Sequence, residues 1–545
     1  MTTRNSQQSL LFSKAFLVFI VAFGVILGTS VSSSEVLADD DTNRTTTIIV
    51  PYTEYEWWVS RWAGNEHLCK IFADHEGMPT ASEVYIYCGE SIYTEWAETL
   101  ACPSAIDGNG ENCSGVYLHL MGSTLKEKEI TIELPVPEAR ITIINCDQLP
   151  NTDLCSYIPS LRITAQESLP NEHIIQIQGL LNNIPFICQG QICEIPLRAT
   201  STQGISLEFW ADSSYGDSSK HYSGRVRVVE SGVSDSLETS GWYVDLISEG
   251  WEGKQAGICA QAWEAFPPIG TPSKWLDSPA STELLASEVP LAYLAGQLIK
   301  RQVVNVSECD DYGLLVNGYA SPCGLDKARP EVIRWQNLFD AQIIETAQES
   351  SVPSQILKRM FAQESQFWPG VIRNTYDEYG LGQLTELGAD TALLWNFDFF
   401  DQFCPLVLSD EACQKGYIHL EEENQILLRG ALLAHVNAEC PTCALGIDIE
   451  GVNSSISLFA QTLIGNCKQA GQIIADATNK VPGEVSDYED LWRFTLVNYH
   501  AGAGCLEEAV NQVAGAGAPI DWSHVSLELE TNCPHAVEYV ENVTQ

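Results

Sequence analysis

Positively charged side chains are scarce in this 545-residue chain. It has 28 lysines and arginines against 72 aspartates and glutamates, which gives a formal net charge of −44. A field of this sign repels phosphate backbones and anionic lipid surfaces. The imbalance therefore argues against nucleic acid as a partner and fits a protein kept soluble outside the cell.

Long apolar runs are also scarce, because only residues 15–28 form one. Arg4 and Lys14 precede this run, and small polar residues, then an acidic stretch, follow it. The pattern predicts a secretory signal peptide over residues 1–38 and a secreted protein or one of the cell envelope. A retained membrane anchor is the alternative, although the run is shorter than the ~20 residues of a bilayer span. No later segment is expected to cross a membrane.

Several motifs of cofactor and nucleophile chemistry are missing. The sequence has no Gly-x-Ser-x-Gly nucleophile elbow and no phosphate-binding glycine-rich loop before a helix. Cys440 and Cys443, with His435 upstream, lack the second paired spacing of a zinc ribbon, so a disulfide is expected there. We therefore predict no metal and no small-molecule cofactor.

Cysteines, by contrast, are abundant. An exported chain with 18 cysteines is expected to form disulfides in an oxidising, extracellular setting. The connectivity is not fixed by the sequence. The nearest candidate pairs are Cys102–Cys113, Cys146–Cys155, Cys309–Cys323 and Cys404–Cys413.

The N-terminal half, residues 45–230, shows the period of β-strands. Apolar residues alternate at 84/86/88, 130/132/134, 205/207/209 and 226/228. We expect an all-β module over 39–140 and an Ig-like β-sandwich module over 141–230, with a single irregular β domain as the alternative. Cys188 and Cys193 flank a Gly-centred turn and predict a stapled hairpin.

After residue 241 the period becomes helical, so the fold class is multidomain: β modules followed by an all-α domain. Pro330 is expected to open a helix that buries Val332, Trp335, Phe339 and Ile343. Leu428, Leu432 and Val436 predict another buried face. Residues 231–330, rich in Gly, Pro and Trp, are expected to be a linker and helical extension before the domain at 331–545.

Glu364 is the most informative residue of this helical half. Pro353 is expected to start a helix on which Leu357, Phe361 and Glu364 share one apolar face. Burial and the negative end of the helix dipole both disfavour the charged form of a carboxylate there. A carboxylic acid that is hard to ionise suits general acid catalysis near neutral pH.

Three short stretches carry a family resemblance. The first contains Glu364, Ser365, Phe367 and Pro369; the second contains Gly380, Leu381, Gln383 and Leu384, with Thr391-Ala392 after it; the third contains Tyr499, Ala501 and Gly502. In this order they resemble the motifs of the soluble lytic transglycosylases, bacterial enzymes with a goose-lysozyme-like fold. The resemblance covers roughly residues 330 to 520.

The resemblance implies a lysozyme-like domain over 331–545 that cleaves peptidoglycan between N-acetylmuramic acid and N-acetylglucosamine. Glu364 would be the single general acid and base, and the product would carry a 1,6-anhydro end. Substrate binding is implied for Ser365, Gly380, Gly382, Gln383, Tyr499 and His500. The implied partner is the peptidoglycan glycan strand.

The chain departs from the family pattern at two of these positions. Gly382 replaces a methionine, which predicts a roomier or more flexible groove floor, and His500 replaces an asparagine with a ring that can titrate.

Two other functions stay open. One is a hydrolytic goose-type lysozyme in which Asp377 activates water, although Thr385 stands where those lysozymes tend to carry an aspartate. The other is a non-catalytic, exported glycan-binding protein whose β modules attach it to a cell surface, with Trp57, Trp58 and Trp62 stacking on sugars.

Overall fold

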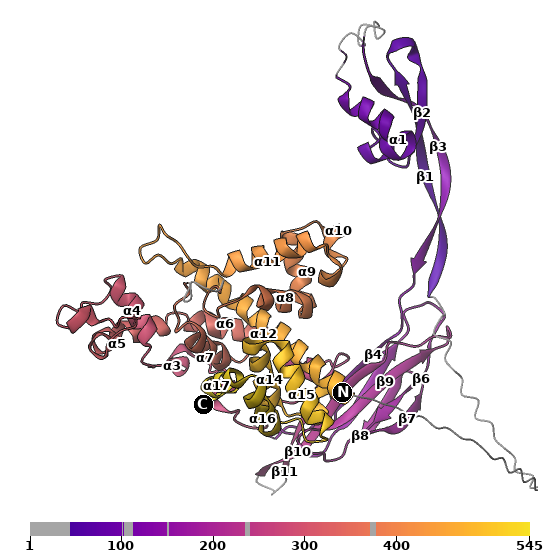
Figure 1. Cartoon of the computed structure of the whole chain (residues 1–545). Helices are drawn as coiled ribbons and strands as arrows, with labels where there is room; N and C mark the ends of the chain where they lie inside the picture. Colours follow the sequence, from indigo (N-terminus) through magenta and orange to yellow (C-terminus); the bar gives the residue numbers. More distant parts are fainter. Residues whose placement is uncertain (1–43, 101, 103–112, 150–151, 235–239, 371–377) are drawn as a thin grey trace, which may run out of the picture. The chain divides into compact units, whose positions relative to one another are not determined.

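The computed structural model describes residues 44–545, except 101, 103–112, 150–151, 235–239 and 371–377 (Figure 1). Strands occupy the N-terminal region from residue 45 to 248, and helices occupy the C-terminal region. The expected signal peptide, with Arg4 and Lys14, lies outside the described residues. Among the helices that are described, none is both long and apolar enough to cross a membrane.

The first sheet is antiparallel and has three strands in the order β2-β1-β3. Its strands are β1 (Thr45–Arg61), β2 (His67–Ala73) and β3 (Val116–Glu133), and α1 (Ala81–Glu98) packs against β2 and β3 (Figure 1). A small core of Val59, Ile71, Val84 and Val116 joins the helix to the sheet. The expectation of an all-β module was therefore wrong, because this module contains a helix.

Residues 84–88 belong to α1, so the prediction of a strand there was wrong. Thr80 caps the helix by accepting from the backbone N–H of Glu83, whose carboxylate accepts from Thr80 in return. This reciprocal capping box is a strong signal for a helix start. Val84 and Cys88 lie one helical turn apart, and Cys88 is bonded to Cys69 of β2. The apolar alternation that suggested a strand also fits this spacing of four.

Two further sheets share one core. One has the order β11-β10-β9-β6-β7, and the other has the order β4-β5-β8. Their strands are β4 (Glu138–Ile144), β5 (Ser160–Gln166), β6 (Ile174–Leu181), β7 (Ile184–Gln189), β8 (Ile192–Pro196), β9 (Ile205–Ser213), β10 (Tyr222–Ser234) and β11 (Ser240–Ser248). Leu207, Phe209, Val226 and Val228 are buried in the shared core, which confirms the predicted alternation.

The disulfide between Cys188 and Cys193 is present, but the hairpin that it was expected to staple is not. Cys188 lies on β7 and Cys193 on β8, and these strands belong to different sheets. Gly190 in the turn between them has φ +83, a conformation that favours glycine. The disulfide thus links the two sheets where the chain passes from one to the other.

The helical region is built around a single large core. Its helices of six residues or more are α2 (Ile258–Trp263), α4 (Ala292–Lys300), α5 (Pro322–Gln336), α6 (Asp340–Ser350), α7 (Ser354–Glu364), α8 (Glu386–Trp395), α9 (Phe397–Phe403), α11 (Glu422–Val436), α12 (Ile449–Thr478), α14 (Tyr488–Ala501), α15 (Ala503–Gly515), α16 (Trp522–Asn532) and α17 (Pro534–Thr544). The short helices of this region are α3 (Thr282–Leu285), α10 (Asp410–Cys413) and α13 (Pro482–Val485), and its 3-10 turns lie at 274–276, 310–313, 404–406 and 417–419. A further 3-10 turn, at 63–65, lies between β1 and β2.

The stretch expected as a linker and helical extension contributes to this core. Trp263 and Leu294 are fully buried in it, and the Cys259–Cys467 disulfide ties α2 to α12. Pro330 does not open a helix, because α5 starts eight residues earlier with Ser321 as its cap and Pro322 in its first turn. The predicted face from Val332 to Ile343 is buried, but it is divided between α5 and α6.

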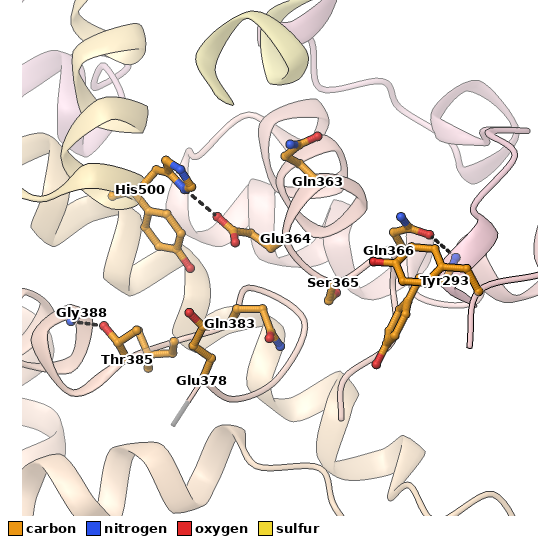
Figure 2. A pocket seen from close by; sticks show the side chains of 13 residues that line it. Tyr293, Gln363, Glu364, Ser365, Gln366, Glu378, Gln383, Thr385, Gly388 and His500 are labelled. Carbon is orange, nitrogen blue, oxygen red and sulfur yellow. Dashed lines mark hydrogen bonds and ion pairs between the residues drawn. The ribbon is translucent and has the colours of Figure 1, made fainter. Parts of the chain in front are cut away.

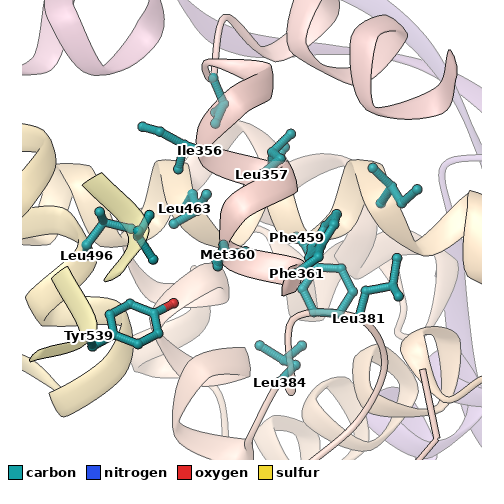
Figure 3. Packing of buried hydrophobic residues seen from close by; sticks show 14 of the residues in the cluster. Ile356, Leu357, Met360, Phe361, Leu381, Leu384, Phe459, Leu463, Leu496 and Tyr539 are labelled. Carbon is teal, nitrogen blue, oxygen red and sulfur yellow. The ribbon is translucent and has the colours of Figure 1, made fainter. Parts of the chain in front are cut away.

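Helix α7 runs through the middle of the core. Leu357, Met360 and Phe361 are fully buried and belong to one cluster with Phe459 of α12 and Leu496 of α14 (Figure 3). The Phe361 and Phe459 rings meet edge to face, with 5.5 Å between their centroids. This packing fixes the helix that carries Glu364.

Nine disulfides join all eighteen cysteines. The four nearest pairs predicted from the sequence are confirmed, and Cys440 bonds Cys443 as expected. The remaining pairs, such as Cys505–Cys533, depend on tertiary contacts. Nine disulfides are consistent with an extracellular protein.

Candidate functional site

Glu364 is the last residue of α7. As expected, the helix starts just after Pro353, and Leu357 and Phe361 on the same face are fully buried. The Glu364 side chain itself keeps 16% of its surface exposed. It thus stands at the carbonyl end of a buried helix, at the boundary between core and solvent.

The chain turns sharply after Glu364. Gln366 (φ +50) and Phe367 (φ +59) both adopt the left-handed conformation, which is unusual for residues other than glycine. Two hydrogen bonds hold this turn: Trp335 Nε1 donates to the Phe367 carbonyl at 2.8 Å, and the Tyr293 N–H donates to Gln366 Oε1 at 2.8 Å. Strained backbone of this kind persists where the surroundings enforce it, often at functional sites.

A cavity of about 350 Å³ opens beside Glu364 (Figure 2). Five segments line it: α4, the turn before α5, the end of α7, the turn leading into α8 together with its first helical turn, and the end of α14. The lining residues are Tyr293, Tyr319, Gln363, Glu364, Ser365, Gln366, Glu378, Gln383, Leu384, Thr385, Gly388, Tyr499 and His500. All three sequence motifs therefore reach one cavity.

His500 is the residue beside the Glu364 carboxylate. Its Nδ1 lies 3.8 Å from Glu364 Oε1 (Figure 2), and its ring stacks on Tyr539 of α17 at 4.1 Å between centroids and 5° between planes. The Tyr539 hydroxyl is buried and lies within reach of the Glu364 carboxylate. Burial, then the charges of Glu364 and Tyr499, and last a side-chain hydrogen bond with Glu364, raise the pKa of Tyr539 well above its usual value.

Tyr499 joins α14 to the turn before α8. Its hydroxyl donates to the Gly382 carbonyl at 2.6 Å. Burial is the main cause that raises the pKa of Tyr499 well above its usual value, and the charges of Glu364 and Glu378 add to it. Tyr499 therefore stays a neutral hydrogen-bond donor at any pH near neutrality.

The turn before α8 presents Gln383 to the cavity. Tyr379 and Leu384 exchange two backbone hydrogen bonds of 3.0 and 2.8 Å, which closes the turn. Gln383 Nε2 donates to the Gly380 carbonyl at 2.8 Å. Gln383 Oε1 is buried and has no hydrogen-bond partner among the described residues. An acceptor held in this way can receive a sugar hydroxyl or an acetamido N–H.

Gly380 and Gly382, expected to line the groove floor, are not among the residues that line the cavity. Gly380 has φ +73, and a Cβ there would lie 2.8 Å from the Val436 carbonyl oxygen. A Cβ on Gly382 would lie 2.6 Å from Phe459 Cδ1 and 2.8 Å from Tyr499 Oη. The expectation of a roomier floor at Gly382 was therefore wrong, because Phe459 and Tyr499 fill that space.

The remaining predicted residues fall as follows. Ser365 lines the cavity, but its hydroxyl is buried and donates to the Phe361 carbonyl at 3.1 Å, so it caps the helix end. Thr385 caps α8 by accepting from the Gly388 N–H at 3.1 Å. Asp377 lies outside the described residues, whereas its neighbour Glu378 lines the cavity.

Sequence reasoning missed Glu378 and Tyr539 as site residues. No pattern in the sequence points to Glu378, because a carboxylate in a loop belongs to no periodic spacing that would predict which way its side chain faces. Tyr539 lies on a helix whose Val537, Val540 and Val543 spacing predicts a buried face. Such a pattern predicts burial, but it does not identify which other helix the residue contacts.

Among the described residues, no group of three or more His, Cys, Asp or Glu side chains could hold a metal ion. Comparison with protein families finds no matching family model, and comparison with curated proteins finds no match either.

Proposed function

We propose that the helical region is a lysozyme-like domain that cleaves the glycan strands of peptidoglycan as a lytic transglycosylase. The observation that carries the proposal is the convergence of Glu364, Gln383 and Tyr499 on one cavity. These residues come from three motifs that lie far apart in the sequence but resemble those of one family. A polar cavity with a half-buried carboxylic acid suits the binding and protonation of a sugar chain.

In the proposed reaction, Glu364 donates its proton to the glycosidic oxygen, and the bond from the anomeric carbon to that oxygen breaks. The electron pair stays on the leaving sugar. The 6-hydroxyl oxygen of the same muramyl residue then bonds to the anomeric carbon, and its proton returns to Glu364. Atoms and protons balance without water, and the product ends in a 1,6-anhydro ring.

The other cavity residues are proposed to hold the sugar. Gln383 Oε1 accepts a hydrogen bond from the substrate, because its amide nitrogen is already bound to Gly380. Tyr499 fixes the turn before α8 through the Gly382 carbonyl. His500 lies beside the acid and stacks on Tyr539.

The experiment that tests this proposal is turnover of purified peptidoglycan by Glu364→Gln. Gln keeps the size of the side chain but cannot donate or accept the proton, so release of soluble fragments is expected to fall by about 10³-fold or more. Glu349→Gln, an exposed site on neighbouring α6, is the control and keeps full activity. Undiminished turnover by Glu364→Gln would remove the mechanism.

For the β-rich region we propose attachment to the cell envelope of a secreted enzyme, with the two sheets of residues 138–248 forming an Ig-like sandwich. The support is the strand pattern together with nine disulfides, which fit an extracellular setting. Cosedimentation with cell-wall sacculi tests it: Glu364→Gln in the full chain is expected to bind more tightly than the same variant lacking residues 44–253. Equal binding would contradict attachment.

A further inference from the structure

Glu378 is a second carboxylate in the cavity, and the proposed mechanism does not yet use it. It lines the same cavity as Glu364 but comes from the turn before α8 (Figure 2). Within the described part of the chain it forms no ion pair and no hydrogen bond. A carboxylate in a protein cleft that pairs with no cation among the described residues is available to a ligand.

The shared cavity and Tyr499 place this carboxylate near Glu364, and two further observations describe the groups around it. The charges of both Glu364 and Glu378 add to the rise in the pKa of the Tyr499 hydroxyl, so both carboxylates lie near it. That hydroxyl already donates to the Gly382 carbonyl, so it neutralises neither carboxylate. Gln383 Oε1, which is buried and without a partner among the described residues, adds a third acceptor oxygen to the same cavity. The three groups favour a ligand that carries hydrogen-bond donors and positive charge.

We propose that Glu378 is a second catalytic carboxylate whose negative charge stabilises the positive charge that develops on the sugar at the cleavage point. This inference rests on the proposed function. When the bond to the leaving oxygen breaks, the anomeric carbon and ring oxygen share a positive charge. Glu364 moves the proton out and back, whereas Glu378 exchanges none. A fixed charge in a partly desolvated site acts most strongly where the transition state becomes charged.

The test compares wild type with Glu378→Gln, Glu378→Asp and Glu386→Gln on purified peptidoglycan. Glu386 is an exposed acid of α8 that does not line the cavity, so its variant controls for loss of one nearby charge. We expect Glu378→Gln to lower kcat by about 10²-fold with little change in KM. Glu378→Asp retains the charge and is expected to recover part of that loss, and the anhydro product is unchanged.

A binding measurement distinguishes the loss of the Glu378 charge from a structural effect of the Glu378→Gln substitution. The probes are the N-acetylglucosamine trisaccharide and an analogue of it with a protonated nitrogen in the ring. Glu378→Gln is expected to bind the neutral sugar as wild type does, but to bind the cationic analogue about 10-fold more weakly. Equal loss for both probes would indicate a structural role and overturn the inference.

The outcomes also separate this inference from the proposed function. If wild type is active, Glu364→Gln is inactive and Glu378→Gln stays within about twofold of wild type, Glu378 has no catalytic role. If wild type forms reducing ends that Glu378→Gln does not form, Glu378 activates water and the inference is wrong. If wild type forms no cleavage product at all, the proposed function itself fails.

Discussion

At the scale of single residues, removing the hydroxyl group from each of two buried tyrosines is expected to change stability by different amounts. Tyr499 donates to the Gly382 carbonyl at 2.6 Å, whereas the Tyr539 hydroxyl makes no comparably good hydrogen bond and only approaches the Glu364 carboxylate. Tyr499→Phe leaves a carbonyl unpaired and is expected to lower the free energy of unfolding by about 1–3 kcal/mol. Tyr539→Phe removes a hydroxyl that only approaches the partly exposed Glu364 carboxylate, so it is expected to destabilise the protein less than Tyr499→Phe does. Urea unfolding of both variants measures the contrast, and equal destabilisation would contradict it.

Gly382 provides a second test at this scale, because it departs from the family pattern. A Cβ there would lie 2.6 Å from Phe459 Cδ1, so Gly382→Ala is expected to destabilise the protein by about 1–3 kcal/mol. Gly504→Ala is the matched control, since nothing lies within 4 Å of its added Cβ. If thermal unfolding shows both variants as stable as wild type, the space at Gly382 is not filled as described.

At the scale of elements, a buried ion pair joins α7 to α6. Lys358 Nζ lies 2.7 Å from both oxygens of Asp340, and their side chains are 3% and 2% exposed. Lys358→Met leaves an uncompensated buried charge, which is expected to lower stability by about 3–5 kcal/mol and to displace Glu364. The measurement is urea unfolding together with turnover.

Two controls accompany this variant. Lys358→Met combined with Asp340→Leu replaces the whole pair by apolar groups and is expected to recover most of the stability. Arg334→Met breaks the exposed pair with Glu331 and is expected to change stability by less than about 1 kcal/mol. A similar loss in all three variants would show that the buried pair has no special role.

The elements also show how far the sequence predicts this fold. Local signals sufficed for α7, α11 and the strands with buried alternation, because period and burial agree there. They failed at Val84–Cys88, because apolar residues two apart predict a strand there, while Val84 and Cys88, four apart, equally fit one face of a helix. They failed again at Cys188–Cys193, because a short connection can join two sheets as well as two strands of one sheet.

For the site, the sequence predicted which motifs would come together, but not which other residues would lie beside them. The three motifs named Glu364, Gln383 and Tyr499, and all three line the cavity. Glu378 and Tyr539 could not be found in this way, since their positions depend on how a loop and the C-terminal helix α17 pack on α7 and α14. Such contacts leave no local period.

At the scale of the whole molecule, the buried tyrosines predict a loss of stability in alkali. Burial raises the pKa of Tyr499 and Tyr539 well above 10, whereas unfolded tyrosines ionise near pH 10. The native state then holds protons that the unfolded state releases, so stability is full below about pH 10 and falls as the pH rises. Each tyrosine is expected to contribute about 1.4 kcal/mol per pH unit in that range.

Urea unfolding at several alkaline pH values, followed by helical circular dichroism, measures this slope. Tyr539→Phe is expected to show a shallower decline than wild type, whereas Tyr312→Phe, at an 81% exposed site, is expected to keep the wild-type slope. Identical slopes in all three proteins would show that Tyr539 can ionise in the native state.

Mass spectrometry of the products that the whole protein forms from purified peptidoglycan distinguishes transfer to the 6-hydroxyl from hydrolysis. We predict muropeptides with 1,6-anhydro ends from wild type and none from Glu364→Gln. Products with reducing ends would contradict transfer to the 6-hydroxyl, because water would then have attacked the anomeric carbon.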